Sequence, residues 1–231
     1  MQRYRVLSIA FAACLALPVI PAGATDSHDY AKDEYAIIQD GLAPDKRLSL
    51  AAHGEGDGGS DNFHVWLMAE PAHRRIAALE AIGSSNNLDT GPDSYRAQWS
   101  MDSRHVAVSF RSDRHVLQLN LYGIEASRAA LIRGPSLFRD VTSRDVGPND
   151  DLRLSTVDIV WMGSRRFVLK ERRSFLTSDP AFKRALGWYG RAMEDAGDGK
   201  QVVEFSAEAD CVLISANRYR ILDLRIGMFS Q

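Results

Sequence analysis

Cysteine is almost absent from this chain, which has 2 cysteines among 231 residues. Cys14 lies in an N-terminal apolar run that we expect to be removed, so Cys211 would be the only cysteine of the mature protein. A single cysteine cannot form an intramolecular disulfide. Because Cys211 lies in the apolar run CVLIS, we expect a small buried hydrophobic residue rather than a nucleophile.

The common motifs of catalytic sites are also missing. The chain contains no Gly-x-Ser-x-Gly, no His-Glu-x-x-His and no phosphate-binding loop motif. The motifs therefore identify no catalytic site, and we predict no cofactor. A carbohydrate-active enzyme or another hydrolase whose acidic residues are scattered along the chain stays as one alternative.

Basic charge is not in excess either. The chain has 28 Lys and Arg against 30 Asp and Glu, and two of the arginines lie in the first 24 residues, so 26 basic residues would remain in the mature protein. A slightly acidic protein is not a general nucleic-acid binder. Removing 24 residues from 231 leaves 207, which suits one domain with a substantial core, so we predict a single domain over residues 25–231.

Long apolar runs are absent after residue 24. The chain opens with Arg3 and Arg5, continues with the run VLSIAFAACLALPVI and reaches the small residues AGA (22–24). This order is typical of a secretory signal peptide, and the run is shorter than the roughly 20 residues of a membrane-spanning helix. We therefore predict a periplasmic or secreted protein with residues 1–24 removed and no transmembrane segment afterwards. An uncleaved anchor and a lipoprotein modified at Cys14 are the alternatives.

Short strand-like runs separated by turn residues fill the rest of the chain, and four segments resemble one another. Each begins with a large apolar residue, continues with a short turn of small or acidic residues, and ends in a strand. The segments are LAPDKRLSL (42–50), WSMDSRHVAV (99–108), WMGSRRFVL (161–169) and FSAEADCVLI (205–214). Repeats that each carry several strands favour a β-propeller, because every blade of a propeller is a small meandering sheet.

The second segment resembles the Trp-Ser-Pro-Asp-Gly repeat of TolB-type periplasmic β-propellers, and the first resembles it from Pro44 and Asp45 onward. Met101 stands where that family has proline, and Ser103 stands where it has glycine. The resemblance implies an all-β, propeller-like array of about four small antiparallel sheets. An antiparallel β-sandwich is the alternative.

The repeat leads to two further expectations about the fold. The aromatic residues Trp99, Trp161 and Phe205 should occupy equivalent buried positions. The strand-like run at 34–39 should lie beside the last strand, around 219–226, and help to close the array, because an uncovered strand edge favours aggregation.

One segment breaks the strand pattern. In DPAFKRALGWYGRAMEDAG (179–197), Asp179 can act as an N-cap, Pro180 suits the first helical position and Gly197 suits the end of a helix. Apolar residues recur in it at helical spacing. We therefore predict one inserted α-helix over about 180–196.

The richest cluster of possible metal ligands is the glycine-rich segment HGEGDGGSDNFH (53–64). Oxygen ligands at alternate positions can suit a hard cation such as calcium. The candidate ligands are His53, Glu55, Asp57, Asp61 and His64. The alternative is a flexible hairpin loop without a metal.

The strand-like run RRFVLKERR (165–173) carries the densest basic charge and suggests a binding surface for an anionic ligand. The candidate binding residues are Arg165, Arg166, Lys170, Arg172 and Arg173. A solvated strand face with edge-protecting charges is the alternative. Together with the leader, the resemblance to TolB-type propellers implies an exported, non-enzymatic binding or protein-interaction module of the cell envelope, whose partner would be an envelope protein or an anionic ligand.

The leader makes a direct prediction. N-terminal sequencing of the exported protein should begin at Thr25, because residues 22–24 form the expected cleavage site. A mature protein that still begins at Met1 would contradict the signal-peptide assignment.

Overall fold

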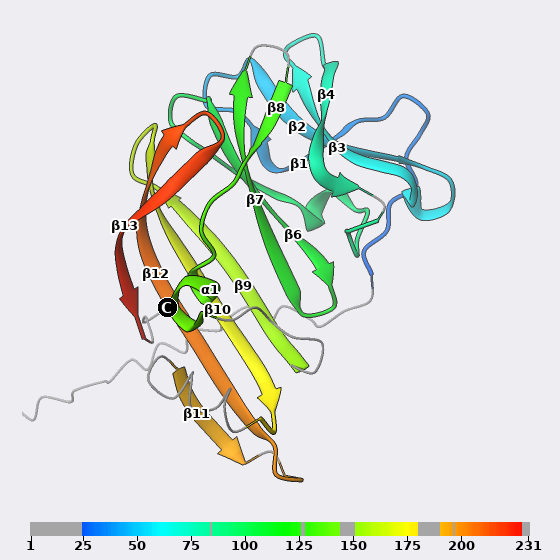
Figure 1. The fold of residues 1–231 in the computed structure, drawn as a ribbon. Helices are drawn as coiled ribbons and strands as arrows, with labels where there is room; N and C mark the ends of the chain where they lie inside the picture. Colours follow the sequence, from blue (N-terminus) through cyan, green and yellow to red (C-terminus); the bar gives the residue numbers. More distant parts are fainter. Residues whose placement is uncertain are drawn as a thin grey trace, which may run out of the picture.

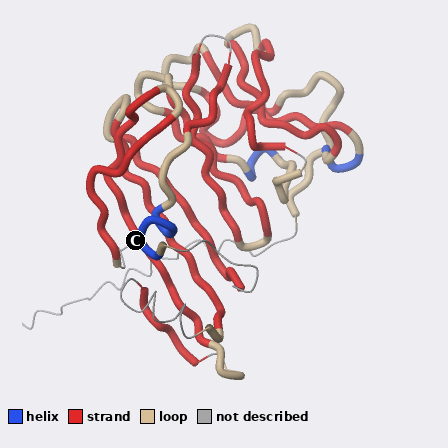
Figure 2. The backbone as a smooth tube through the Cα atoms, in the orientation of Figure 1, coloured by secondary structure: helices blue, strands red, loops and turns tan. Residues whose placement is uncertain are grey.

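The computed structural model describes residues 25–83, 85–125, 128–143, 151–179, 190–195 and 197–227, and these residues form an all-β fold. The all-β prediction is therefore confirmed. Figure 2 shows that strands account for most of the described chain, with the short helix α1 (Leu137–Thr142) as its one α-helix. No helix in this part of the chain is long and apolar enough to cross a membrane.

The strands form three consecutive antiparallel meanders of four strands each (Figure 1). The first contains β1 (Ala36–Leu42), β2 (Leu48–Glu55), β3 (Asp61–Ala69) and β4 (Arg74–Gly83). The second contains β5 (Arg96–Trp99), β6 (His105–Asp113), β7 (Val116–Glu125) and β8 (Arg128–Ile132). The third contains β9 (Asp151–Trp161), β10 (Arg166–Thr177), β12 (Gln201–Ser215) and β13 (Arg218–Ile226). Two 3-10 turns, η1 (Asp57–Gly59) and η2 (Pro92–Ser94), lie in the connections.

Parallel contacts join the three meanders into one open, mixed sheet. β1 pairs with β5 at Gln39 and Arg96, and β7 pairs with β9 at Val116 and Ser155. The sheet runs from β11 and β12 at one end to β3 and β4 at the other, and it does not close. The described residues therefore form one continuous sheet of three meanders, and not the array of about four separate sheets, or the sandwich, that the sequence suggested.

The prediction of a helix over about 180–196 is wrong for the residues of this range that the structure describes. Residues 190–195 form the strand β11 (Gly190–Asp195), which pairs with the first part of β12, for example Met193 with Val202. Residues 180–189 and 196 lie outside the described residues. The first residues of β12 extend beyond β13, so their backbone N–H and C=O groups need other partners. The strand β11 provides these hydrogen bonds, which a helix would not do. The helical spacing of apolar residues did not indicate that this segment pairs with β12.

Two apolar cores lie against the sheet. The first is built from the first two meanders and contains Phe63, Tyr95 and Phe110. The ring centroid of Tyr95 lies 5.4 Å from that of Phe63 and 6.0 Å from that of Phe110. The second contains Phe138 of α1 and Phe205 of β12, whose rings lie 5.2 Å apart, and it is built mainly from the third meander. Each core holds together because alternate residues of its strands point inward.

Strand β12 shows the inward alternation most clearly, and Cys211 is one of its inward residues. The side chains buried along this strand are Val203, Phe205, Ala207, Ala209, Cys211 and Leu213. Burial raises the pKa of the Cys211 thiol to about 12, so the thiol is protonated and unreactive. The expectation of a small buried hydrophobic residue at this position is confirmed.

The first two repeat segments form turns of the same geometry. In the β1–β2 turn, Asp45 Oδ1 accepts a hydrogen bond from the backbone N–H of Arg47, and in the β5–β6 turn Asp102 Oδ1 accepts one from Arg104, at 3.0 and 3.2 Å. The residue after each aspartate has a positive φ, 57° at Lys46 and 58° at Ser103. Both turns therefore have the aspartate-capped geometry that the aligned letters suggested.

The third and fourth segments match less well. The third forms the β9–β10 turn, which is one residue shorter, with Met162 N–H donating to Arg166 O at 2.8 Å. The fourth lies wholly inside the continuous strand β12 and forms no turn. Phe205 is buried there but is not equivalent to Trp99 and Trp161, which stand at the ends of β5 and β9.

The two tryptophans link successive meanders. Trp99 Nε1 donates to the carbonyl oxygen of Gly41 in β1 at 3.2 Å, and Trp161 Nε1 donates to the carbonyl oxygen of Gln98 in β5 at 2.9 Å. Gly41 and Gln98 are the residues that precede the first apolar residue of the first and second repeat segments. Each indole therefore donates a hydrogen bond to the backbone carbonyl at the equivalent position of the preceding meander.

The expected pairing of the N- and C-terminal strands is wrong. β1 lies between β2 and β5, whereas β13 pairs with β12 in the third meander. The segment before β1 is fixed elsewhere: Asp26 N–H donates to Asp89 Oδ1 at 2.8 Å, and Tyr30 OH donates to Thr90 O. Asp89 is buried and accepts two hydrogen bonds of 2.6 Å from Arg111, so its charge is neutralised.

The indole links give a stability prediction. Replacing Trp161 by Phe keeps an aromatic ring but removes the N–H donor to Gln98, which should lower the free energy of unfolding by about 1 kcal/mol. Trp66→Phe is a matched control, because Nε1 of Trp66 has no hydrogen-bond partner among the described residues. Urea unfolding should show a larger loss for Trp161→Phe, and equal losses would contradict a role for the indole link.

Candidate functional site

A pocket of about 260 Å³ opens between the second and third meanders, and we call it the apolar pocket. Its walls come from β7, β8, the loop that leads to α1, and the strands β9, β10 and β13. The described lining residues are Leu119, Asn120, Leu121, Leu131, Ile132, Gly134, Pro135, Ser136, Leu137, Val157, Ile159, Phe167, Leu169, Glu171, Arg173 and Tyr219. Most of these side chains are apolar, as is usual for sites that bind small molecules.

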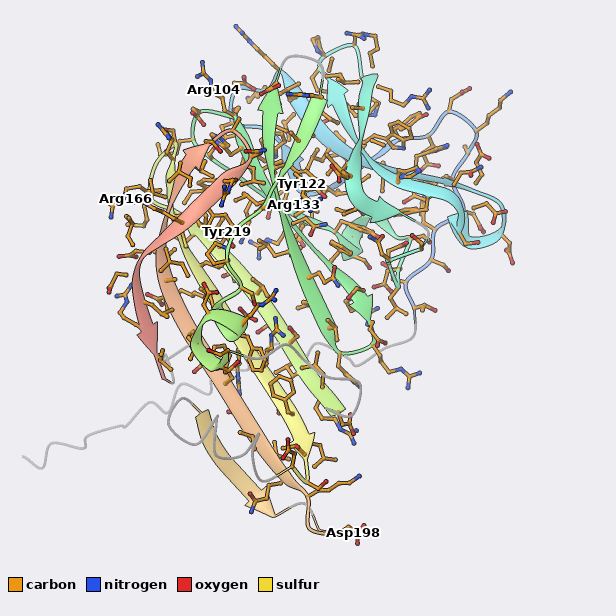
Figure 3. The ribbon with its side chains drawn as sticks, viewed as in Figure 1. Arg104, Tyr122, Arg133, Arg166, Asp198 and Tyr219 are labelled. Atoms are coloured by element: carbon orange, nitrogen blue, oxygen red, sulfur yellow. The ribbon has the colours of Figure 1, made fainter. Side chains whose placement is uncertain are left out.

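Tyr219 of β13 fixes one wall of the apolar pocket. Its hydroxyl donates to Pro135 O at 2.8 Å, and its backbone N–H donates to Arg133 O at 3.3 Å. A side chain at Gly134 would meet the Tyr219 ring at 2.0 Å, so glycine is required for this approach. Figure 3 shows Tyr219 and Arg133 beside each other in the space between the two meanders. Burial is the main cause that raises the pKa of Tyr219, so its hydroxyl stays protonated and can donate.

The charged part of the described lining of the apolar pocket is one ion pair. Glu171 is 5% exposed and accepts a hydrogen bond of 2.5 Å from Arg173 Nε and one of 3.3 Å from the backbone N–H of Phe138. The Arg173 guanidinium also lies over the Phe138 ring, 4.8 Å from its centroid. The carboxylate therefore attaches the first turn of α1 to β10, and it is satisfied by these donors.

Carboxyl groups are scarce in the described lining of the apolar pocket. Acid–base hydrolysis of a glycoside needs two carboxyl groups about 5–10 Å apart across the substrate. Among the described residues that line the apolar pocket, Glu171 is the one carboxyl group, and Arg173 holds it. The hydroxyl of Ser136 caps α1 by accepting a hydrogen bond from the backbone N–H of Arg139.

The five predicted basic residues do not form a common surface. Lys170 and Arg172 face acidic partners on β12, with Lys170 Nζ 3.8 Å from Glu208 and Arg172 2.9 Å from Glu204. Arg173 is the partner of Glu171. The charge of the middle of β10 is therefore matched by its neighbours, which is the solvated strand face given above as the alternative.

The other two predicted basic residues lie at the β9–β10 turn. Arg165 donates from its guanidinium to Leu213 O at 2.7 Å, and Arg166 is exposed. In Figure 3, Arg166 projects from the edge of the molecule on the side where Arg104 also projects. Arg165 lies in the turn and Arg166 is the first residue of β10, so both stand at the end of the strand and apart from its middle.

The five predicted metal ligands lie along the β2–β3 hairpin without converging on an ion. His53 and His64 each direct Nδ1 to a backbone carbonyl, Glu34 O at 2.6 Å and Ile82 O at 3.3 Å. Glu55 accepts a hydrogen bond from Asn62, while Asp57 lies in η1. Among the described residues, no three His, Cys, Asp or Glu side chains form a group that could hold a metal ion. The metal prediction gains no support from this geometry.

The sequence analysis did not identify Glu171, Tyr219 or Gly134. A signal for Glu171 is present, because it lies two residues after Leu169 and four after Phe167, on the buried face of β10. A carboxylate on a buried strand face requires a partner. For Tyr219 and Gly134 no local pattern indicates that two segments distant in the sequence meet.

Comparison with protein-family models and with curated protein sequences finds no match to this chain. The candidate function therefore depends on the geometry described above.

The buried ion pair of the apolar pocket gives a second stability prediction. Glu171→Gln removes the charge that holds Arg173, and it should lower the free energy of unfolding by about 2–4 kcal/mol, as expected when one partner of a buried pair is lost. Glu125→Gln makes the same change in an exposed pair, 2.6 Å from Arg128, and should cost less than about 1 kcal/mol. Thermal unfolding of both variants would measure the difference, and similar losses would show that Glu171 is not needed to hold α1.

Proposed function

We propose that this protein is an exported, non-enzymatic binding module of the cell envelope that holds an apolar group in the apolar pocket. The observation that carries the proposal is an open pocket of about 260 Å³ in which 10 of the 16 lining residues are apolar and the single carboxylate is already paired. A dry cavity of about 150 Å³ suffices to bind benzene. The apolar pocket therefore suits a ligand with one or two rings, or a branched apolar group of similar size.

We further propose that the three meanders are related to the blades of TolB-type propellers and that the protein works in the periplasm or outside the cell. The shared aspartate-capped turn of the first two meanders and the matching indole bonds support the relationship. The positive and apolar start of the chain supports export.

A pocket-filling variant tests the binding proposal. Leu119→Trp should occupy the apolar pocket with its own side chain and abolish the binding of indole, followed by chemical-shift changes in NMR spectra. Leu117→Trp introduces the same residue on the same strand at a position that does not line the pocket, and it should bind indole like the unaltered protein.

Two outcomes would overturn the proposal. One is that the unaltered protein shows no saturable binding of indole or of other one- and two-ring compounds. The other is that Leu119→Trp, with a normal melting curve, still binds as well as Leu117→Trp. Mass spectrometry of compounds extracted from the exported protein would then identify the natural ligand among those that Leu119→Trp fails to retain.

A further inference from the structure

The three hairpin turns of the meanders lie together at one end of the molecule. Figure 1 shows the turns β1–β2, β5–β6 and β9–β10 side by side, next to the β12–β13 hairpin. Asp45 N–H in the first turn donates to Ser103 Oγ in the second at 3.1 Å. The rings of His105, after the second turn, and Trp161, before the third, lie 5.9 Å apart. We call this end the turn face.

A second pocket, of about 290 Å³, opens on the turn face, and we call it the basic pocket. Its described lining residues are Arg104, His105, Gly123, Ile124, Glu125, Arg165, Leu213, Ser215 and Ala216. Arg104 and Arg165 are at equivalent places in their turns, each one residue before the hydrogen bond that closes the hairpin, made by His105 O and Arg166 O. The basic pocket is therefore formed where the same turn position of two meanders converges.

The two arginines are not neutralised within the described part of the chain. Arg165 has a backbone oxygen as its guanidinium partner, Leu213 O at 2.7 Å, and Arg104 has no ion pair or side-chain hydrogen bond among the described residues. Glu125 is the pocket's one carboxyl group, and Arg128 occupies it at 2.6 Å. The described lining thus carries two uncompensated positive charges, in contrast to the paired charges of β10.

His105 adds no charge to this balance at neutral pH. Burial is the main cause that lowers its pKa, Arg165 and Arg104 lower it further, and Asp102 and the Ser164 backbone act in the opposite direction. The imidazole is therefore neutral at pH 7, so the positive charge of the basic pocket comes from its two guanidinium groups.

We propose that the basic pocket binds a phosphate group of a small ligand or a lipid headgroup. A carboxylate has two oxygens, which a single arginine can satisfy, whereas a phosphate offers three oxygens that can accept from two guanidinium groups in different turns. The volume of the pocket leaves room for part of the group that carries the phosphate. The site is separate from the apolar pocket and does not depend on the function proposed there.

The surroundings of the basic pocket are compatible with a phosphate at a lipid surface as well as with a free one. Three apolar side chains of the turn segments are exposed: Leu42 at 46%, Met101 at 81% and Met162 at 68%. Exposed apolar side chains beside basic ones are typical of proteins that bind the surface of anionic membranes. Binding assays with different probes are therefore needed to tell a soluble phosphate ligand from a lipid headgroup.

Three probes distinguish these sources: inorganic phosphate and glucose 6-phosphate in calorimetric titrations, and phosphatidylglycerol vesicles in co-sedimentation, with phosphatidylcholine vesicles as the uncharged reference. Binding of either soluble probe would assign a soluble phosphate ligand. Binding of phosphatidylglycerol vesicles alone would assign a lipid headgroup. Either result would support the phosphate site. The absence of saturable binding to every probe at low salt would overturn it.

Matched arginine variants locate the binding. Arg104→Gln and Arg165→Gln should each weaken binding of the successful probe about tenfold or more, with unchanged melting curves. Arg166→Gln, which removes the same charge from an exposed residue next to Arg165 outside the pocket lining, should change binding less than twofold. Equal losses in all three variants would indicate nonspecific attraction to basic charge and would overturn the site. Leu119→Trp should leave phosphate binding intact, which keeps this test independent of the apolar pocket.

Discussion

The fold depends on a sheet segment, β6 and β7, that is buried on both faces. Successive residues of a strand point to opposite faces, so Leu121 of β7 lies in the second core while Tyr122 lies in the first. In β6, Ala107 faces the second core and Val106 the first. The two cores therefore lie on the two faces of these strands, and β7 also contributes to both pockets: Leu119 and Leu121 line the apolar pocket, and Gly123 and Glu125 line the basic one.

The sequence predicted the local structure well. The strand alternation indicated an all-β fold, and the letters PDKR and MDSR predicted the two aspartate-capped turns whose hydrogen bonds at Asp45 and Asp102 are equivalent. Such features are visible because they are set by residues within a few positions of one another. The third turn, at Gly163, was found despite its shorter length.

What failed was every prediction that depended on which strands meet. The number of sheets and the position of β1 follow from long-range pairing, for which the local letters carry little information. The strand β11 pairs locally with the start of β12, for example Met193 with Val202, and there the helical spacing of apolar residues was misleading. The same limit applies to charge. Lys170 stands directly opposite Glu208, and the basic run of β10 can be seen as neutralised only when β12 is known to be its neighbour.

The contrast between β10 and the turn face shows how position decides whether charge is available for binding. On a strand, a basic side chain has cross-strand neighbours at fixed spacing, and opposite charges there pair at little cost. At the turn face, Arg165 lies beside β12 but has the backbone oxygen of Leu213 as its partner there, and neither Arg104 nor Arg165 has an acidic partner among the described residues, so their charge is available for the ligand proposed above. The same net charge in the sequence therefore has different consequences in the two places.

The two cores also differ in when they can form during synthesis. Every residue of the first core lies between Tyr30 and Leu131, whereas the second requires residues as far as Leu224. A chain that emerges from its N-terminal end can bury the first core while the last hundred or so residues are still missing, since domains fold as their segments become available. During that interval the outward face of Leu121 has no cover, so the third meander completes the molecule by closing over a surface that is already in place.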